Sequence, residues 1–269
     1  MSGLIIPLGG GPWSGGVVTE NATCVLAHNP GPMTLDGTNT WVLRAPGESV
    51  AVVVDPGPDD DDHRAAILAA IDGARVERIL LTHGHHDHSE GARSLADAVH
   101  APVLALDPEH RFGAEGVTDG EVVVAGSLEV AVVATPGHTA DSLTFHLRND
   151  AALLTGDTVL GRGTTVVAYP DGRLDDYFGT LDRLSALATE TEAQRVLPGH
   201  GPVLADPAGV LAAYRVHRHE RLDQVRAALA QGAVTADDVV RIVYSDVPRN
   251  VWPAAKRSVL AQLAYLDRA

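Results

Sequence analysis

The chain has 269 residues, of which 45% are hydrophobic and 20% are charged, enough for one large domain with or without a small second one. Its formal net charge of −15 disfavours non-specific nucleic-acid binding at long range, and we expect no DNA-specific binding. The single cysteine, Cys24, excludes an internal disulfide framework. Because no secretory signal and no apolar run of about 18 residues is seen, we expect no membrane binding and a cytoplasmic location in a bacterium.

The first two hundred residues predict short strands alternating with helices. Apolar, β-branched runs bounded by turn residues indicate strands at 50–54, 76–81, 121–125, 128–133, 143–147, 151–154 and 195–197. Helical patterns cover 65–71, preceded by helix-start carboxylates at 59–62, and also 92–99 and 174–188. This mixture of hairpins and α/β crossovers predicts sheets covered by helices.

The character of the chain changes at about Asp206, where strand signals end and three helices are indicated, at 208–230, 235–244 and 254–266. Thr235 and Asp238 have the spacing of a helix-capping pair. Residues 206–269 carry 9 Lys and Arg against 7 Asp and Glu, whereas the remaining 11 basic and 28 acidic residues give 1–205 a charge of −17. We therefore predict a catalytic domain over 1–205 and a helical domain over 206–269.

The strongest chemical signal is a run of histidines and one aspartate directly after a predicted strand. It reads Thr82-His83-Gly84-His85-His86-Asp87-His88. On an extended loop, imidazoles two residues apart can converge on one ion, and the Asp-His pair that follows can turn to a second ion. Neutral imidazole and carboxylate are ligands that suit zinc. A solvated histidine-rich loop is the alternative interpretation.

Three further ligand-type residues decide between these interpretations, because each follows a short strand and a glycine that allows a sharp turn. They are His138, Asp157 and His200. A structural zinc site is closed by four ligands, usually with cysteines, whereas five histidines and two aspartates without cysteine imply two metal ions in an open, hydrolytic site. We expect two Zn²⁺, with another divalent metal as the alternative. The other eight histidines lack this context and are expected on the surface.

These motifs resemble those of the metallo-β-lactamase-fold hydrolases over about residues 20–205. The resemblance implies an αββα sandwich with the metals at one edge. It assigns the first metal to His83, His85 and His138 and the second to Asp87, His88 and His200, with Asp157 between the two. Asp55, at the end of its own strand, matches an aspartate that would brace the histidine loop from behind.

Two further segments, 29–40 and 160–166, are similar to the β-lactamase-like-protein-2 group, which includes a mitochondrial endoribonuclease acting on single-stranded RNA. This resemblance reaches the C-terminal helices, which in that group form a small winged-helix-like domain. Within these two segments, Asn39, Thr164 and Thr165 are candidate substrate contacts, and a simple glycine-rich turn is the alternative interpretation of 161–165. Only 42 residues separate Asp157 from His200, which leaves no room for the insertion of the cassette-bearing nucleases.

The expected mechanism is attack by a metal-bound hydroxide on phosphorus or a carbonyl carbon, with Asp87 and Asp157 as the catalytic carboxylates. Single-stranded RNA is the first substrate hypothesis. Small esters, lactones, thioesters or β-lactams are the second. A metal-dependent binding or sensing protein is a third hypothesis, and an iron redox role is a fourth, although the 64-residue tail is too short for a flavin module. The sequence leaves the oligomeric state open.

Residues 206–269 are predicted to form one wall of the substrate cleft, because the helices begin close to His200. The basic side chains of these helices are expected on a solvated helical face, with contacts to phosphates as the alternative; they are Arg218, Arg221, Lys256 and Arg257.

Overall fold

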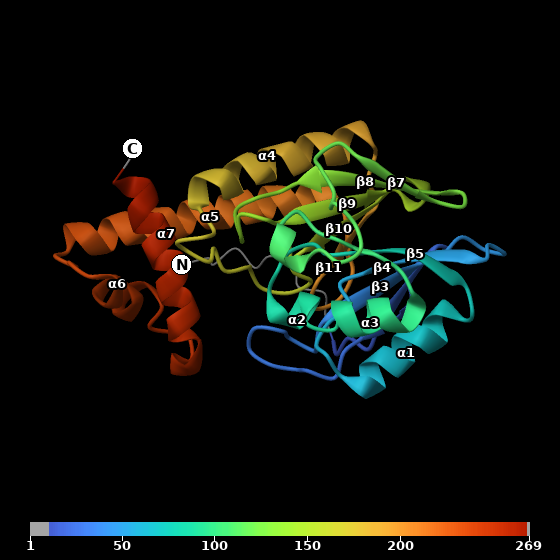
Figure 1. The fold of residues 1–269 in the computed structure, drawn as a ribbon. Helices are drawn as coiled ribbons and strands as arrows, with labels where there is room; N and C mark the ends of the chain where they lie inside the picture. Colours follow the sequence, from blue (N-terminus) through green and yellow to red (C-terminus); the bar gives the residue numbers. More distant parts are fainter. Residues whose placement is uncertain (1–10, 268–269) are drawn as a thin grey trace.

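Two six-stranded mixed sheets lie face to face in the computed structural model, which describes residues 11–267 (Figure 1). The first sheet has the order β1-β2-β3-β4-β5-β6, antiparallel up to β4 and parallel from β4 to β6. Its strands are β1 (Gly16–Val17), β2 (Ala22–Leu26), β3 (Asn39–Leu43), β4 (Val50–Val54), β5 (Arg75–Leu80) and β6 (Val103–Leu104).

The second sheet has the order β12-β11-β10-β9-β8-β7, and only β10 and β11 run parallel. Its strands are β7 (Val122–Ala125), β8 (Leu128–Ala134), β9 (Leu143–Leu147), β10 (Ala152–Gly156), β11 (Arg195–Pro198) and β12 (Leu204–Ala205). Short 3-10 helices connect some elements, namely η1 (Pro108–His110), η2 (Arg148–Asp150) and η3 (Arg249–Val251).

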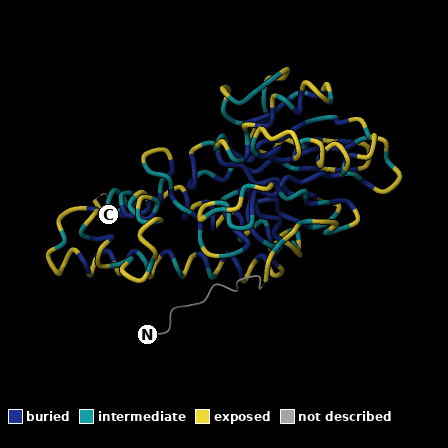
Figure 2. Tube along the Cα trace, turned by 90° about the horizontal axis from the view of Figure 1, so that it is seen from below, coloured by how far each residue is buried: buried dark blue, intermediate teal, exposed yellow. Residues whose placement is uncertain are grey.

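The main core fills the space between the sheets. Trp41, Leu43 and Val54 of the first sheet share one buried cluster with Val130 and Phe145 of the second. Burial is concentrated between the layers, while the outer helix surfaces remain exposed (Figure 2). Aliphatic side chains supply most of this cluster, as the low aromatic content requires.

Helices cover the outer face of each sheet. The first sheet is covered by α1 (Asp61–Ile71) and α3 (Ala92–Val99), and the second by α4 (Leu174–Glu190) and α5 (Pro207–Ala230) (Figure 1). Asp60 caps α1 by accepting a hydrogen bond from the His63 amide, which agrees with the carboxylate-rich helix start seen in the sequence. The αββα sandwich predicted from the sequence is confirmed.

The C-terminal helices α6 (Ala236–Val243) and α7 (Trp252–Leu266) pack against the second half of α5 and extend the molecule at one end (Figure 1). Thr235 and Asp238 form the reciprocal capping box that their spacing predicts. The first half of α5 packs on α4 instead, so this one helix contributes to the sandwich and to the C-terminal cluster. No helix within residues 11–267 is both long and apolar enough to cross a membrane.

Candidate metal centre and adjoining cleft

The ligand-type residues gather because strands of both sheets end at one edge of the sandwich. Asp55 follows β4, the histidine loop follows β5, and Asp157 and His200 follow the parallel strands β10 and β11. At Gly199, an added Cβ would lie 2.7 Å from His88 Cε1 and 2.8 Å from Asp157 Oδ1, so the backbone approaches the centre more closely than any side chain permits. The glycine before His200 is therefore required by packing.

The histidine loop splits between two positions. His83 and His85 lie on the extended part, and a single helical turn, α2 (His86–Ser89), then carries Asp87 and His88. Because this turn redirects the backbone, Asp87 and His88 reach a different point from the two preceding imidazoles, whereas His86 is exposed to solvent.

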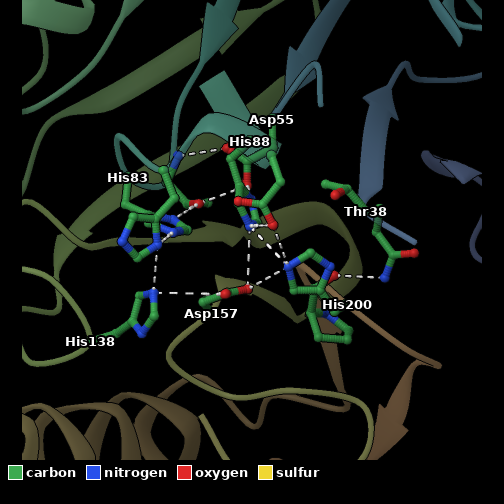
Figure 3. Close-up of polar contacts among 12 residues, drawn as sticks. Thr38, Asp55, His83, His88, His138, Asp157 and His200 are labelled. Carbon is green, nitrogen blue, oxygen red and sulfur yellow. Dashed lines mark hydrogen bonds and ion pairs between the residues drawn. The ribbon is translucent and has the colours of Figure 1, made fainter. Parts of the chain in front are cut away.

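The first group of nitrogens is formed by three imidazoles (Figure 3). His85 Nδ1 lies 3.0 Å from His83 Nε2 and 3.1 Å from His138 Nε2. His138 Nδ1 lies 2.6 Å from the carbonyl oxygen of Val166 and must donate to it, so its Nε2 presents a lone pair to the group. Convergent nitrogens of this kind are the arrangement in which imidazoles bind a cation.

The second group combines Asp87 with two buried imidazoles. His200 Nε2 lies 3.1 Å from Asp87 Oδ2 and 3.2 Å from His88 Nε2. The opposite nitrogens donate away from the group, His200 Nδ1 to the Gly37 carbonyl at 3.1 Å and His88 Nδ1 to Asp55 at 2.9 Å. Both Nε2 atoms therefore point into the group, where a bound cation can take the place of a proton.

Asp157 lies between the two groups. Its Oδ1 is 3.4 Å from both His88 Nε2 and His200 Nε2, while its Oδ2 is 3.7 Å from His138 Nε2 (Figure 3). Oδ1 is buried and makes no hydrogen bond. A buried carboxylate oxygen without a hydrogen-bond donor fits a cation-binding position.

Asp55 is buried behind the histidine loop. Its two oxygens accept hydrogen bonds from the Thr82 amide at 2.8 Å and the Thr82 hydroxyl at 2.7 Å, and Oδ2 also accepts from His88. The hydroxyl of Thr82 is in turn 3.0 Å from His83 Nδ1. One carboxylate therefore fixes the start of the loop and the ring orientation of His88.

The electrostatics of the centre separate the two groups. Burial and the neighbouring imidazoles lower the pKa values of His83, His85 and His138, that of His138 to about 4, so these rings are neutral at pH 7. Burial acts in the same direction on His88 and His200, but the carboxylates beside them raise both pKa values. Positive charge is favoured where these two rings meet Asp157.

The pKa values of the two carboxylates shift the other way. Burial would raise the pKa of Asp87, but His200 and His88 hold it at about 2, and the pKa of Asp157 is also held well below its usual range by His200 and His88. Both carboxylates are therefore ionised at neutral pH, which is the form that binds cations. The side chain of Asp87 is the more exposed of the two, at 31% against 12%.

A cleft of about 300 Å³ opens from Asp157 and His138 towards the C-terminal helices. One wall is the 160–166 loop, and the other is formed by α5, α7 and the segment between α6 and α7. Much of the lining is apolar, including Met33, Leu35, Leu160, Val247, Val251 and Ala254. Residues beyond 206 thus line this cleft, as the sequence predicts.

Thr164 and Thr165 both lie in this wall, but with different roles. Thr165 is buried, and its Oγ1 lies 3.1 Å from His138 Nδ1, so it helps to hold the imidazole. Thr164 is half-buried in the lining, where a substrate can contact it.

The expected role of Asn39 as a substrate contact is wrong. Asn39 is fully buried, donates to the carbonyl oxygens of Pro198 at 2.9 Å and Gly201 at 2.8 Å, and accepts from Trp13 Nε1 at 2.8 Å. Its amide fastens the loop that carries His200 to β3. All its hydrogen-bonding capacity is used inside the protein, which leaves nothing for a ligand.

The C-terminal helices differ from the expected solvated face. Arg218 is only 3% exposed, and His217 and Arg221 are half-buried and line the cleft. His63 and His146, also expected on the surface, are buried at 5% and 6% exposure. Sequence periodicity missed these residues because their burial depends on partners distant in the chain.

A second pocket, of about 250 Å³, lies on the other side of the histidine loop beside Gly84 and His85. Its charged lining is acidic, with Asp107, Asp141 and Asp171. The metal centre therefore stands between an acidic pocket and a cleft whose α5 wall is basic.

Comparison with known proteins decides the family. Residues 33–200 match the model of the metallo-beta-lactamase superfamily, and residues 235–268 match a beta-lactamase associated winged helix domain. The chain belongs to the metallo-beta-lactamase superfamily. The expected family is confirmed, and so is the expectation that the chain is a hydrolase, the activity that members of this superfamily generally have.

The chain matches several relatives over most of its length. It is 31% identical to the Drosophila melanogaster "Beta-lactamase-like protein 2 homolog" and 34% identical to that of Caenorhabditis elegans, covering 93% of this chain and 89% and 85% of theirs. It is also 32% identical to an "Atrochrysone carboxyl ACP thioesterase" of Aspergillus chevalieri, over 92% of this chain and 82% of the relative.

Solved structures share the fold. A beta-lactamase domain protein from Burkholderia ambifaria superposes with a TM-score of 0.78 at 24% identity, covering 97% of this chain and 91% of its own. TTHA1623, solved in a di-iron-bound form, has a TM-score of 0.54 at 26% identity and covers 68% of this chain and 94% of its own.

Proposed function

We propose that the chain is a two-metal hydrolase and that zinc is its metal. The first ion would be held by the imidazoles of His83, His85 and His138, and the second by Asp87, His88 and His200, with Asp157 as a shared ligand. The position of Asp157 carries this proposal, because its two oxygens face different groups and Oδ1 has no hydrogen-bond donor.

The donor set fits divalent ions. Among the described residues, three sets of donor atoms each lie within 4.8 Å of one another, namely His83 with His85 and His138, His83 with His88 and Asp157, and Asp87 with His88 and His200. Imidazole nitrogens and carboxylate oxygens are ligands that zinc accepts. The second nitrogens of His88, His138 and His200 are already hydrogen-bonded to protein acceptors, so ring orientation is fixed before an ion binds. This preorganisation favours ion binding over a solvated loop.

Ions at such a site supply Lewis acidity and make water acidic enough to serve as a nucleophile near neutral pH. The chain itself supplies orientation and access. Asp55 and Thr82 fix the histidine loop, Thr165 and the Val166 carbonyl fix His138, and the cleft admits the substrate from the side of the C-terminal helices.

The first substrate we propose is a phosphodiester of single-stranded RNA. The basic α5 wall can hold a phosphate, and Tyr244 in the same wall offers an aromatic face against which a base can stack. Similarity to β-lactamase-like-protein-2 relatives across most of the chain supports this choice. The charge of −17 on residues 1–205 restricts the site to short, local contacts with a polyanion.

The second substrate class is a small ester or thioester, and the apolar lining of the cleft favours it. Met33, Leu35 and Val251 offer surface for a hydrocarbon portion that RNA does not have. A relative named as an acyl-carrier-protein thioesterase, matched over 92% of this chain, supports this alternative.

Elemental analysis tests the metal centre. We expect close to two ions per chain, and zinc in place of iron or manganese in the active form. The Asp157→Ala variant should bind fewer ions and lose activity at least about 100-fold, because the shared ligand is removed. The Asp97→Ala variant, which removes an exposed carboxylate, should keep the same number of bound ions and the same activity. Full activity with one bound ion would refute the two-metal centre.

A substrate panel tests the reaction. The metal-loaded chain is incubated with a short single-stranded RNA, a chromogenic acyl thioester, a lactone and a β-lactam. We expect RNA cleavage that is lost in the Asp157→Ala variant, since cleavage that survives there would come from a contaminating nuclease. Efficient thioester turnover without metal-dependent RNA cleavage would show that a small ester or thioester, and not RNA, is the substrate.

A further inference from the structure

Three nitrogen-bearing side chains of α5 face the cleft from one helical stripe. His217, Arg218 and Arg221 occupy positions i, i+1 and i+4, and all three line the cavity that begins at Asp157. Arg221 Nε lies 3.4 Å from His217 Nε2, and the guanidinium of Arg221 stacks on the Tyr244 ring at 4.8 Å. The three groups therefore form a cluster, here called the α5 basic cluster.

The charge of the α5 basic cluster is not neutralised within the protein. Within residues 11–267, no carboxylate forms an ion pair with Arg218 or Arg221. Elsewhere on the same helix, Arg215 pairs with Asp182 and Arg226 with Asp223. A buried guanidinium without a counter-charge is costly, so its retention beside the reaction centre points to an anion supplied by a ligand.

Two nitrogens of the cluster also lack hydrogen-bond partners. Arg218 donates through Nη2 to the Thr165 carbonyl and lies 4.9 Å from the Tyr177 ring centroid, but its Nε has no acceptor. His217 Nδ1 is likewise buried and unpartnered. Buried polar atoms are nearly always satisfied in native proteins, so two exceptions in one cavity wall indicate a missing partner.

The local potential is positive. Burial and the two neighbouring guanidinium groups lower the pKa of His217 to about 4, so the ring resists a further proton. The pocket on the other side of the metal centre is acidic, through Asp107, Asp141 and Asp171, and would repel the same anion. Of these two pockets, the cleft beside α5 is therefore the one that favours an anionic group.

We propose that the α5 basic cluster is an oxyanion-binding subsite that receives a phosphate or carboxylate group of the substrate next to the bond that is cleaved. The inference rests on the proposed hydrolase function. It predicts the orientation of the bound substrate, whose anionic group would lie towards α5. A phosphate would belong to an RNA strand and a carboxylate to a small acyl substrate. The two unpartnered nitrogens, His217 Nδ1 and Arg218 Nε, donate to the anion, and the guanidinium of Arg221 adds its positive charge beside them.

Binding of simple anions to the metal-loaded chain tests the subsite without turnover. Inorganic phosphate and, separately, acetate are titrated by calorimetry at fixed ionic strength. Arg221→Gln and His217→Gln are the test variants, because both side chains are half-buried and their loss leaves the Arg218 contact intact. Arg226→Gln removes the same charge from the exposed, paired part of α5 and is the matched control.

We expect Arg221→Gln to weaken the binding of at least one anion by about tenfold or more, and Arg226→Gln to leave it unchanged. The anion that is affected identifies the substrate class. In a parallel titration followed by NMR, the ring resonances of His217 should shift, whereas those of His219, exposed on the same helix, should not.

Unchanged phosphate and acetate binding in both test variants would overturn the subsite, since the anions would then bind at the metal ions or elsewhere. Activity is measured separately on the substrate panel. A chain that binds phosphate through Arg221 but hydrolyses none of the panel would retain the subsite and refute the proposed hydrolysis.

Discussion

Arg218 of α5 donates a hydrogen bond of 2.5 Å to the carbonyl oxygen of Thr165, which ties the C-terminal helices to the metal centre. The hydroxyl of Thr165 lies 3.1 Å from His138 Nδ1, so the chain of contacts from α5 to a candidate ligand has only one intermediate residue. α7 supports the same loop, because Ser258 Oγ accepts a hydrogen bond of 3.3 Å from the Val167 amide. The cleft wall and the metal centre are therefore mechanically connected.

Replacing Arg218 with alanine should disturb both stability and metal binding. We expect the free energy of unfolding to fall by about 2–3 kcal/mol, because a buried carbonyl loses its donor and a buried side chain is removed. Zinc affinity, measured by competition with a chelator, should fall about tenfold, since the loop behind His138 loosens. The control variant Arg215→Ala, which removes an exposed ion pair with Asp182, should lower the free energy of unfolding by less than about 1 kcal/mol. Unaltered zinc affinity in Arg218→Ala would contradict the connection.

Truncation separates the roles of the C-terminal helices. A chain ending at Ala205 should not fold stably, because Val210, Leu211 and Tyr214 of α5 are buried in the cluster that covers the second sheet. A chain ending at Gly232 keeps α5 and removes α6 and α7. It should still bind metal, although more weakly because the Ser258 contact to the Val167 amide is lost, and it should show a KM raised about tenfold or more, because one cleft wall is missing. An unchanged KM in this shorter chain would show that the cleft is not the substrate site.

The Asn39→Ala substitution should lower the stability of the fold without changing substrate binding. Two buried carbonyl oxygens, of Pro198 and Gly201, lose their donors, so we expect unfolding to become easier by about 2–4 kcal/mol in urea denaturation. Substrate KM should stay close to that of the parent protein once the metal is bound. A large KM effect without loss of stability would restore Asn39 as a substrate contact.

The thiol of Cys24 should be chemically inert in the folded chain. Burial raises its pKa to about 12, although the hydrogen bond from Trp13 opposes the shift, so almost no thiolate exists at pH 8. Iodoacetamide should label the native protein very slowly and label it fully in denaturant. Because the folded pKa is raised, this group's contribution to stability is complete at neutral pH and declines between about pH 9 and 12. Rapid native labelling would contradict this burial.

The fold and the candidate centre were largely predictable because their signals are local. Strands β4 and β9 and helix α3 have the boundaries predicted from the sequence, and the strand-glycine-ligand order of His138, Asp157 and His200 brings these residues to one edge. For Asp157 and His200 that order reflects a general property of the sheet edge, where the carboxyl ends of parallel strands expose the next side chain, whereas His138 reaches the same edge from the antiparallel strand β8.

Non-local burial explains what was missed. Strand β3 is buried at all five positions, so it lacks the alternation that indicates a strand, and Asn39 in it read as a free polar residue. Arg218 has the sequence neighbours of a solvated helix face, and only the distant Thr165 carbonyl and Tyr177 ring account for its burial. No spacing rule connects residues 53 positions apart.

The continuity of α5 has a consequence for how such enzymes change. The first half of this 24-residue helix packs in the sandwich and its second half packs in the C-terminal cluster. The helix therefore fixes the distance between the sandwich and the C-terminal cluster. Substitutions on α6, α7 and the segment between them can reshape the pocket while the reactive centre stays in place. Substrate selectivity can then change among relatives while the metal centre, and with it the catalytic chemistry, stays the same.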